Sequence, residues 1–176
     1  RFSRLRTMGY PMIKFALRIC AVFVLLASFG SEAAFQPNAI TAVLNIATLK
    51  NTTPQYTVIQ TQGYYAQGDG GGGLFQWDPV SVASDNGGTV IQLNAGGTGR
   101  WLRINDSTIP VKAFGARCDD AADDTLVINK ALDTNISVQF GSGTCRISGS
   151  LIPSNNQTIF MTANTVIKQM ADPVPG

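Results

Sequence analysis

The sequence predicts a mainly β protein in which short strands are joined by turns. Glycine is abundant, with 18 residues among 176, while apolar residues make up 44% of the chain and charged residues 14%. This composition differs from that of a disordered, highly charged polymer and favours many short strands over long helices. Beyond the N-terminal region, only the segment that follows a cluster of aspartates has a convincing helical pattern.

The N-terminal region has the three parts of a secretory signal. Basic residues come first, an uncharged apolar run occupies residues 19–30, and small residues at Ser31 and Ala33 have the spacing of a signal-peptidase site. The alternative is a membrane anchor, but a span needs roughly 20 apolar residues. We therefore expect residues 1–33 to be an N-terminal extension and signal peptide, with Met12 as the start. The protein is then expected to be secreted or periplasmic.

The charge that remains after signal cleavage argues against a nucleic-acid partner. Residues 34–176 contain eight basic residues, ten aspartates and no glutamate, so the net charge is 8 − 10 = −2. A nucleic-acid-binding surface needs a basic patch. The sequence gives no sign of one.

Two cysteines remain in the exported chain. Cys20 lies in the apolar run and leaves with the signal, whereas Cys118 and Cys145 form an even pair. Export favours oxidation, so we predict a disulfide between them. Two reduced, buried thiols are the alternative.

Residues 34–106 are expected to form a small β-rich module. The run at residues 39–49 is compatible with either a helix or two short strands, because its periodicity does not decide between them. Further along, β-branched and aromatic residues predict strands. These strands are expected within residues 55–66, 74–78, 89–93 and 100–104. Asn86-Gly87 is a hairpin signal, and residues 105–110 are expected to be a hinge.

The glycine run at residues 68–73 raises the question of a phosphate-binding loop. Backbone N–H groups in such loops cradle anions. However, the Lys-Ser/Thr ending of a P-loop is absent and the following residues alternate like a strand. We therefore interpret the run as a tight turn between strands.

Four aspartates lie within residues 119–124, directly before an apolar run with helical spacing. We expect a short strand at residues 111–116, a polar loop at 117–124 and then a helix with an apolar face. The predicted apolar face consists of Leu126, Val127, Ile128, Ala131 and Leu132. Asp123 or Asp124, followed by Thr125, is a good helix N-cap, and negative charge suits that end of the helix.

A metal or catalytic role for the aspartates is less well supported by the sequence. A calcium loop would need regularly alternating oxygen ligands that end in glutamate, and this spacing is missing. The chain has no histidine, and no second chemical partner lies nearby in sequence. We therefore predict no metal ligand and assign Asp123 and Asp124 a structural role.

The segment FGARCDDAADDTLVINKALD resembles the entry motif of the pectate-lyase-like superfamily, F-G-A-x-G-D-G-x-x-D-D-T-x-A-I-x-x-A. The matching residues are Phe114, Gly115, Ala116, Asp119, Asp123, Asp124, Thr125, Ile128 and Ala131. The chain departs from this pattern at Cys118 and Asp120, where the motif has glycine. The resemblance extends over residues 109–170.

This resemblance implies a right-handed parallel β-helix whose N-terminal end is covered by the helix after the aspartates. Residues 107–176 would then be that cap and the first coils of a truncated β-helix. The preceding module resembles the segment before the β-helix in many phage tailspikes and related bacterial exported proteins. An end coil exposes apolar core and strand edges, so a cap is physically reasonable.

The family includes polysaccharide lyases, glycoside hydrolases and epimerases, so the resemblance implies a polysaccharide as the partner. It also allows a homotrimer, and calcium as a cofactor of the full-length protein, with no cofactor expected in this fragment. No acidic residue occurs between Asp133 and Asp172. We therefore expect the catalytic residues to lie after Gly176 and leave open whether this chain is itself an enzyme. The alternative is a non-catalytic glycan-binding, adhesin or tailspike-like structural protein.

Overall fold

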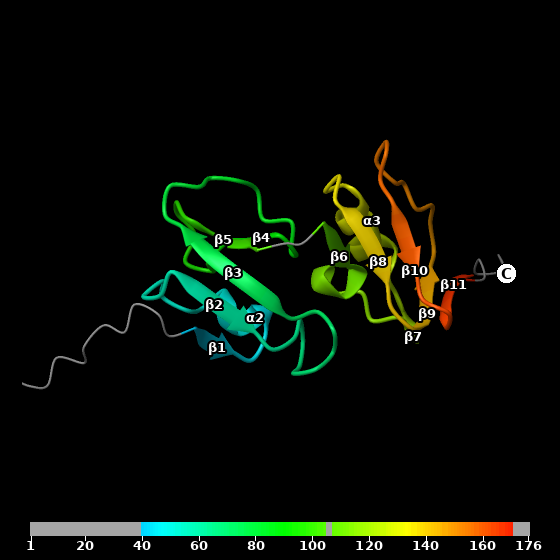
Figure 1. Cartoon of the computed structure of the whole chain (residues 1–176), viewed down its shortest axis with the longest axis horizontal. Coiled ribbons are helices and arrows are strands. Elements are labelled where there is room, and N and C mark those ends of the chain that lie inside the picture. The colour runs from blue at the N-terminus through cyan, green and yellow to red at the C-terminus, as the bar shows by residue number, and fades with distance from the viewer. Residues whose placement is uncertain (1–39, 105–106, 171–176) are drawn as a thin grey trace, which may run out of the picture. The chain divides into compact units, whose positions relative to one another are not determined.

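The computed structural model describes residues 40–104 and 107–170 (Figure 1). The expected signal peptide, residues 1–33, lies outside these residues. The prediction of a mainly β chain is confirmed, because strands outnumber helices throughout the described part. None of the helices found there is long and apolar enough to cross a membrane.

The first sheet has five strands in the order β1-β2-β3-β5-β4. β1 pairs with β2 in parallel, and the other neighbours are antiparallel. Its strands are β1 (Thr41–Val43), β2 (Val58–Thr61), β3 (Gly73–Asp78), β4 (Val90–Ile91) and β5 (Arg100–Arg103). A one-turn helix, α2 (Ile46–Leu49), follows β1.

One face of this sheet and α2 together form the first hydrophobic core. Ile59 pairs with Phe75, and Trp101 pairs with both Trp77 and Ile91, so these side chains share a face. Ile46 and Leu49 of α2 join the same cluster. Each large side chain buried in this way contributes roughly 1.5–3 kcal/mol. The helix begins at Asn45, whose side chain accepts a hydrogen bond from the backbone N–H of Thr48.

Two details of the module differ from the sequence-based expectations. The run that was compatible with either a helix or two strands contains one strand, β1, followed by one helix, α2. The Asn86-Gly87 signal does not join neighbouring hairpin strands, because β4 pairs with the later strand β5. Instead, the Asn86 side chain accepts three backbone N–H groups and closes its own turn.

The second part of the chain contains two three-stranded parallel sheets. Strands of one sheet alternate along the sequence with strands of the other. The first consists of β6 (Thr108–Pro110), β8 (Ser137–Phe140) and β10 (Ile159–Met161), and the second of β7 (Asp119–Asp123), β9 (Gly143–Ile147) and β11 (Thr165–Gln169).

Three local expectations in this part were wrong. Most of the predicted strand at 111–116 is a 3-10 helix, η1 (Val111–Phe114), which ends at Gly115 in the left-handed region with φ 92°. The predicted polar loop contains β7, because its backbone pairs with β9 through an irregular register. Of the predicted hinge at 105–110, residues 105–106 lie outside the described part and Thr108–Pro110 forms β6.

Helix α3 (Thr125–Leu132) forms where the apolar spacing predicts it. Ile128, Ala131 and Leu132 are fully buried, and they pack in the second hydrophobic core with residues of η1 and β8. Leu126 was predicted on this apolar face but is 68% exposed. Leu126 lies in the first turn of α3, on the side of the helix that faces solvent.

Candidate functional site

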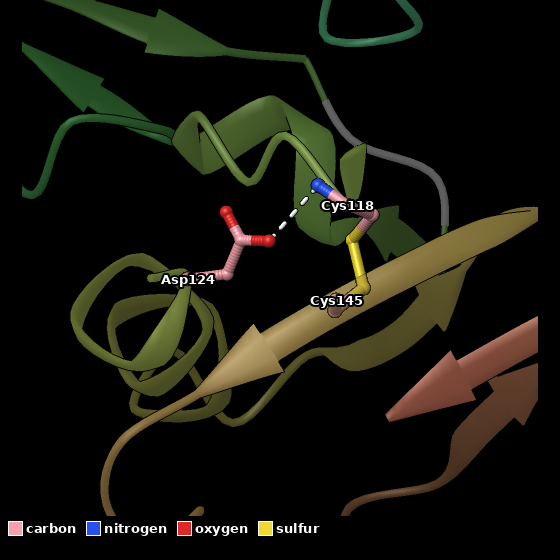
Figure 2. A group of neighbouring side chains, drawn as sticks. All are labelled: Cys118, Asp124 and Cys145. Atoms are coloured by element: carbon pink, nitrogen blue, oxygen red, sulfur yellow. Dashed lines mark hydrogen bonds between the residues drawn. A yellow bond between two sulfur atoms is a disulfide. The ribbon is translucent and has the colours of Figure 1, made fainter. Parts of the chain in front are cut away.

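The turn between η1 and α3 contains the residues that the sequence singled out. The predicted disulfide joins Cys118 of this turn to Cys145 in β9 (Figure 2). Cys118 and Asp120 have positive φ angles of 49° and 56°. Glycine adopts this region most readily. These are the two positions at which the chain departs from the glycines of the resembled motif, so the backbone has the shape that glycine would favour.

Asp124 is buried and lies beside the disulfide. Its carboxylate accepts a hydrogen bond from the backbone N–H of Cys118 at 2.9 Å (Figure 2). The backbone N–H of Arg117 donates to the other oxygen of this carboxylate at 2.8 Å. Asp124 occupies the N-cap position of α3, but its side chain makes no capping hydrogen bond. The carboxylate therefore fixes the turn that precedes the helix. Its backbone carbonyl accepts the N–H of Ile128 and starts the helical pattern.

The sulfur atoms of Cys118 and Cys145, together with an Asp124 oxygen, are close enough to resemble a metal-binding set. A thiol must be deprotonated and free to bind a metal. Both sulfurs are bonded to one another, so the group as found offers no thiolate. Its chemistry is that of a structural crosslink.

Asp123 is exposed and connects the start of α3 to the end of β9. Its carboxylate accepts hydrogen bonds from the backbone N–H and hydroxyl of Thr125 and from the hydroxyl of Ser148. The hydroxyls of Ser148 and Thr125 and the Thr125 N–H lower the pKa of Asp123 to about 2. A carboxylate this acidic is a weak general base near neutral pH. Whether Asp123 is structural and not catalytic stays a prediction.

The other two aspartates have separate partners. Asp119 accepts the backbone N–H groups of Ala121 and Ala122, which lower its pKa. Asp120 pairs with Lys168 at 3.3 Å and with Arg146 at 3.9 Å. The four carboxylates therefore do not converge on a single ligand position.

The glycine run also has an internal explanation. Asp69 accepts the backbone N–H groups of Tyr64, Tyr65, Ala66 and Gly71 at 2.7–3.0 Å. Burial opposes the ionisation of Asp69, but these donors outweigh it and lower the pKa. A carboxylate of the chain itself thus occupies the donors that would otherwise be available to a bound anion.

Two carbonyl groups of the same run face the half-buried side chain of Arg103. Arg103 donates to the carbonyls of Gly71 and Gly72, each at 2.9 Å, and to that of Gly88 at 3.0 Å. Burial lowers the pKa of Arg103 to about 10. A phosphate loop presents N–H groups to an anion, whereas this loop presents carbonyls to a guanidinium. The geometry matches a structural turn.

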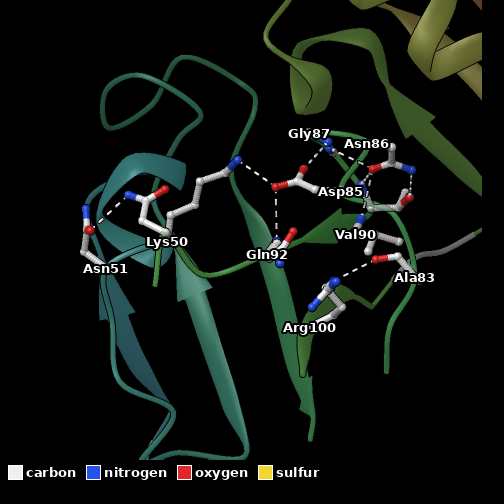
Figure 3. A network of polar contacts seen from close by, with 12 residues as sticks. Lys50, Asn51, Ala83, Asp85, Asn86, Gly87, Val90, Gln92 and Arg100 are labelled. Carbon is white, nitrogen blue, oxygen red and sulfur yellow. Dashed lines mark hydrogen bonds and ion pairs between the residues drawn. The ribbon is translucent and has the colours of Figure 1, made fainter. Parts of the chain in front are cut away.

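A second polar network organises the loop between β3 and β5. Asp85 accepts hydrogen bonds from Lys50 at 2.7 Å and from the backbone N–H of Gly87 and Gln92 (Figure 3). Arg100 is almost fully buried and donates to carbonyls of the same loop, including that of Ala83. Sequence reasoning missed these roles. The only available signal was the Asp-Asn-Gly-Gly turn, which does not reveal distant partners.

Comparison with known proteins agrees with this architecture. Residues 42–106 match the family model described as the phage tail protein small four-stranded beta-sheet domain. Strands β2 to β5 lie within this range, and β1 (Thr41–Val43) begins one residue before it.

Solved tailspike-type structures resemble a larger part of the chain. The enzymatically active domain of tailspike protein 2 from bacteriophage CBA120 has a TM-score of 0.61 and 23% identity, covering 85% of this chain and 22% of that one. Pantoea stewartii WceF, a glycan biofilm modifying enzyme with a tailspike-like parallel β-helix fold, has a TM-score of 0.59 and 21% identity, covering 76% and 22%. Tailspike gp49 of Acinetobacter baumannii bacteriophage Fri1, a capsular polysaccharide depolymerase, has a TM-score of 0.55 and 22% identity, covering 76% and 23%.

These likenesses show a tailspike-type fold, as the sequence resemblance predicted. The chain spans about a fifth of the length of the structures it matches. What those proteins do to glycans is therefore a property of much longer chains.

Proposed function

We propose that this chain is the N-terminal part of an exported, right-handed parallel β-helix protein that degrades or modifies polysaccharide. The observation that carries the proposal is the regular parallel pairing of the second part. Val138 pairs with Ile159, and Thr144 with Val166, which gives separations of 159 − 138 = 21 and 166 − 144 = 22 residues. Successive coils of a solenoid repeat at such a period.

In this proposal α3 closes the first end of the coil stack. The helix lies in the sequence between β7 and β8 and buries Ile128, Ala131 and Leu132 in the core that contains Val138 and Phe140. The parallel pairing from Ile109 to Val138 spans 138 − 109 = 29 residues, longer than the next coil because it includes the helix. An apolar stack needs such a cover.

The glycan part of the proposal is supported by the kinds of protein that share the fold. Two of the similar structures are described as a glycan biofilm modifying enzyme and a capsular polysaccharide depolymerase. No acid lies between Asp133 and Asp172 in this chain, so the paired carboxylates that glycosidases use would come from later coils. Calcium and a homotrimer, which the family resemblance allows, would likewise involve the full-length protein.

The test is an activity assay on the full-length protein and on residues 34–176 alone. A panel of capsular and uronate-containing polysaccharides is incubated with each, and lyase products are measured by absorbance and hydrolysis products by reducing ends. We expect turnover by the full-length protein and none by residues 34–176. Turnover by the short chain that a single substitution abolishes would contradict the assignment. Binding without cleavage by the full-length protein would favour the alternative, a non-catalytic glycan-binding or adhesin-like protein.

A further inference from the structure

A cleft of about 300 Å³ lies between the loop at residues 64–69 and the turn at residues 112–119. We call it the Tyr65 cleft. Besides two alanines, its lining residues are Tyr64, Tyr65, Asp69, Lys112, Arg117 and Asp119. Clefts that hold small ligands begin at about this volume, and they combine aromatic walls with a few polar groups.

The two carboxylates of the Tyr65 cleft are largely engaged with the backbone. Both oxygens of Asp69 accept N–H groups of its own loop, two on each oxygen. One oxygen of Asp119 accepts the N–H groups of Ala121 and Ala122. Of these four oxygens, only the second oxygen of Asp119 accepts no hydrogen bond from another described residue. The cleft therefore offers one free carboxylate oxygen.

The two cations of the cleft, in contrast to its carboxylates, have side chains without hydrogen-bond partners in the described part of the chain. Lys112 and Arg117 have no hydrogen-bond or ion-pair partner for their side-chain nitrogens among the described residues, although Asp119 lies close enough to Arg117 for the guanidinium to help lower the carboxyl pKa. Five of the six other cations of the described part bind oxygen atoms of the chain, and exposed Lys130 is the exception. The five are Lys50, Arg100, Arg103, Arg146 and Lys168.

The position of Arg117 suits its guanidinium to bind a planar anion. Its guanidinium carbon lies 4.3 Å from the centre of the Tyr65 ring. The Tyr65 hydroxyl in turn donates to the carbonyl of Gly115 at 2.9 Å, and the Tyr64 ring packs against Tyr65 edge-on at 4.7 Å. Stacking on an aromatic face leaves the edge N–H groups of a guanidinium free, and these match a carboxylate in a bidentate arrangement.

We propose that the Tyr65 cleft binds a sugar residue that carries a carboxylate, as a non-catalytic glycan subsite. Arg117 and Lys112 would bind the carboxylate, the second oxygen of Asp119 would accept a sugar hydroxyl, and the tyrosines would face the ring. The free acceptor favours a sugar acid, whose ring hydroxyls lie several bonds away from its carboxylate, over inorganic phosphate, whose hydroxyl is on the anion itself. The choice of a glycan rests on the proposed function.

The test measures binding of small probes to the purified protein by NMR titration or calorimetry. We expect methyl glucuronide to bind at millimolar strength and methyl glucoside, which has a CH₂OH group in place of the carboxylate, to bind at least tenfold more weakly. Inorganic phosphate should compete only weakly. Lys112→Ala and Arg117→Ala should each weaken glucuronide binding at least fivefold, whereas Arg117→Lys should recover part of it.

Lys130→Ala is the matched control, because Lys130 is an exposed cation on α3 outside the cleft. It should leave glucuronide binding unchanged, and all variants should keep the thermal midpoint of the unmodified protein. Equal binding of glucuronide and glucoside, tighter binding of phosphate, or no binding at all would overturn the proposal. These probes contain no cleavable glycan chain, so a negative result here is independent of the polysaccharide assay above.

Discussion

Strands β8 and β10 are neighbours in one sheet, carry similar side chains in register, and differ sharply in burial. Val138 and Phe140 of β8 are 0% and 1% exposed, whereas their partners Ile159 and Met161 in β10 are 40% and 52% exposed. The difference lies in what covers each strand. Residues of η1 and α3 pack against the β8 side chains, and no described residue does the same for β10. Apolar residues occupy the paired positions in both strands, so the packing partners that cover a strand decide how far these residues are buried.

The largest effect that would test this comparison comes from truncating the two partners. In the 176-residue chain, Phe140→Ala should lower the free energy of unfolding by about 3–5 kcal/mol because it opens a cavity in a closed core. Met161→Ala should cost less than about 1 kcal/mol, since the side chain is half exposed. Urea unfolding of both variants measures this.

The same pair of variants sharpens the proposal of a longer β-helix. In the full-length protein, a following coil would cover β10, and Met161→Ala should then cost about 2–5 kcal/mol, as buried methionines do. An equal cost of Met161→Ala in the short and long chains would mean that the next layer does not lie on β10.

The disulfide links β9 to the turn before α3, and its loss should have the next largest effect on stability. The Cys118–Cys145 bond closes a loop with a sequence separation of 27 residues. In the chain-entropy account, a loop of this length contributes on the order of 3 kcal/mol. Reductant should lower the unfolding midpoint of the unmodified protein and leave that of the double Cys→Ala variant unchanged. No change with reductant would show that packing alone holds the turn before α3 against β9.

The elements that could be predicted from the sequence are those with a local pattern. β3 has aromatic residues at alternating positions, Phe75 and Trp77, and α3 has apolar residues at helical spacing. The disulfide was predicted from an even cysteine pair in a chain expected to be exported. In each case the residues that define the element also stabilise it.

The elements that could not be predicted depend on distant partners. β7 consists of aspartates and alanines, which are poor strand formers, and it is a strand because β9 pairs with it. Asp123 or Asp124 was expected to cap α3 through its side chain, yet the carboxylate of Asp124 binds the N–H groups of Arg117 and Cys118. The Tyr65 cleft has lining residues from two separate segments, so no local motif marks it.

Asp124 provides a further test, this time of the turn before α3. Asp124→Ala should lower the free energy of unfolding by about 2–3 kcal/mol, because two backbone N–H groups would be left without their charged acceptor. Asp120→Ala is the control, since its carboxylate makes exposed ion pairs that contribute about 0–1 kcal/mol. Equal effects of the two changes would show that the turn does not depend on the buried carboxylate.

The smallest expected effect concerns the pH dependence of the contact between Asp123 and Ser148. The pKa of Asp123 is lowered to about 2 in the folded chain, chiefly by the hydroxyls of Ser148 and Thr125, whereas an unfolded aspartate has a pKa near 4. The folded state therefore binds this proton less readily than the unfolded state. The ionised carboxylate stabilises the fold above about pH 4, and that contribution is lost as the pH falls from about 4 to about 2. In Asp123→Asn, thermal midpoints should fall less steeply over this interval than in the unmodified protein, while the two should differ by a constant amount above pH 5. Parallel curves across the whole range would mean that the exposed contact does not hold α3 to β9 in solution.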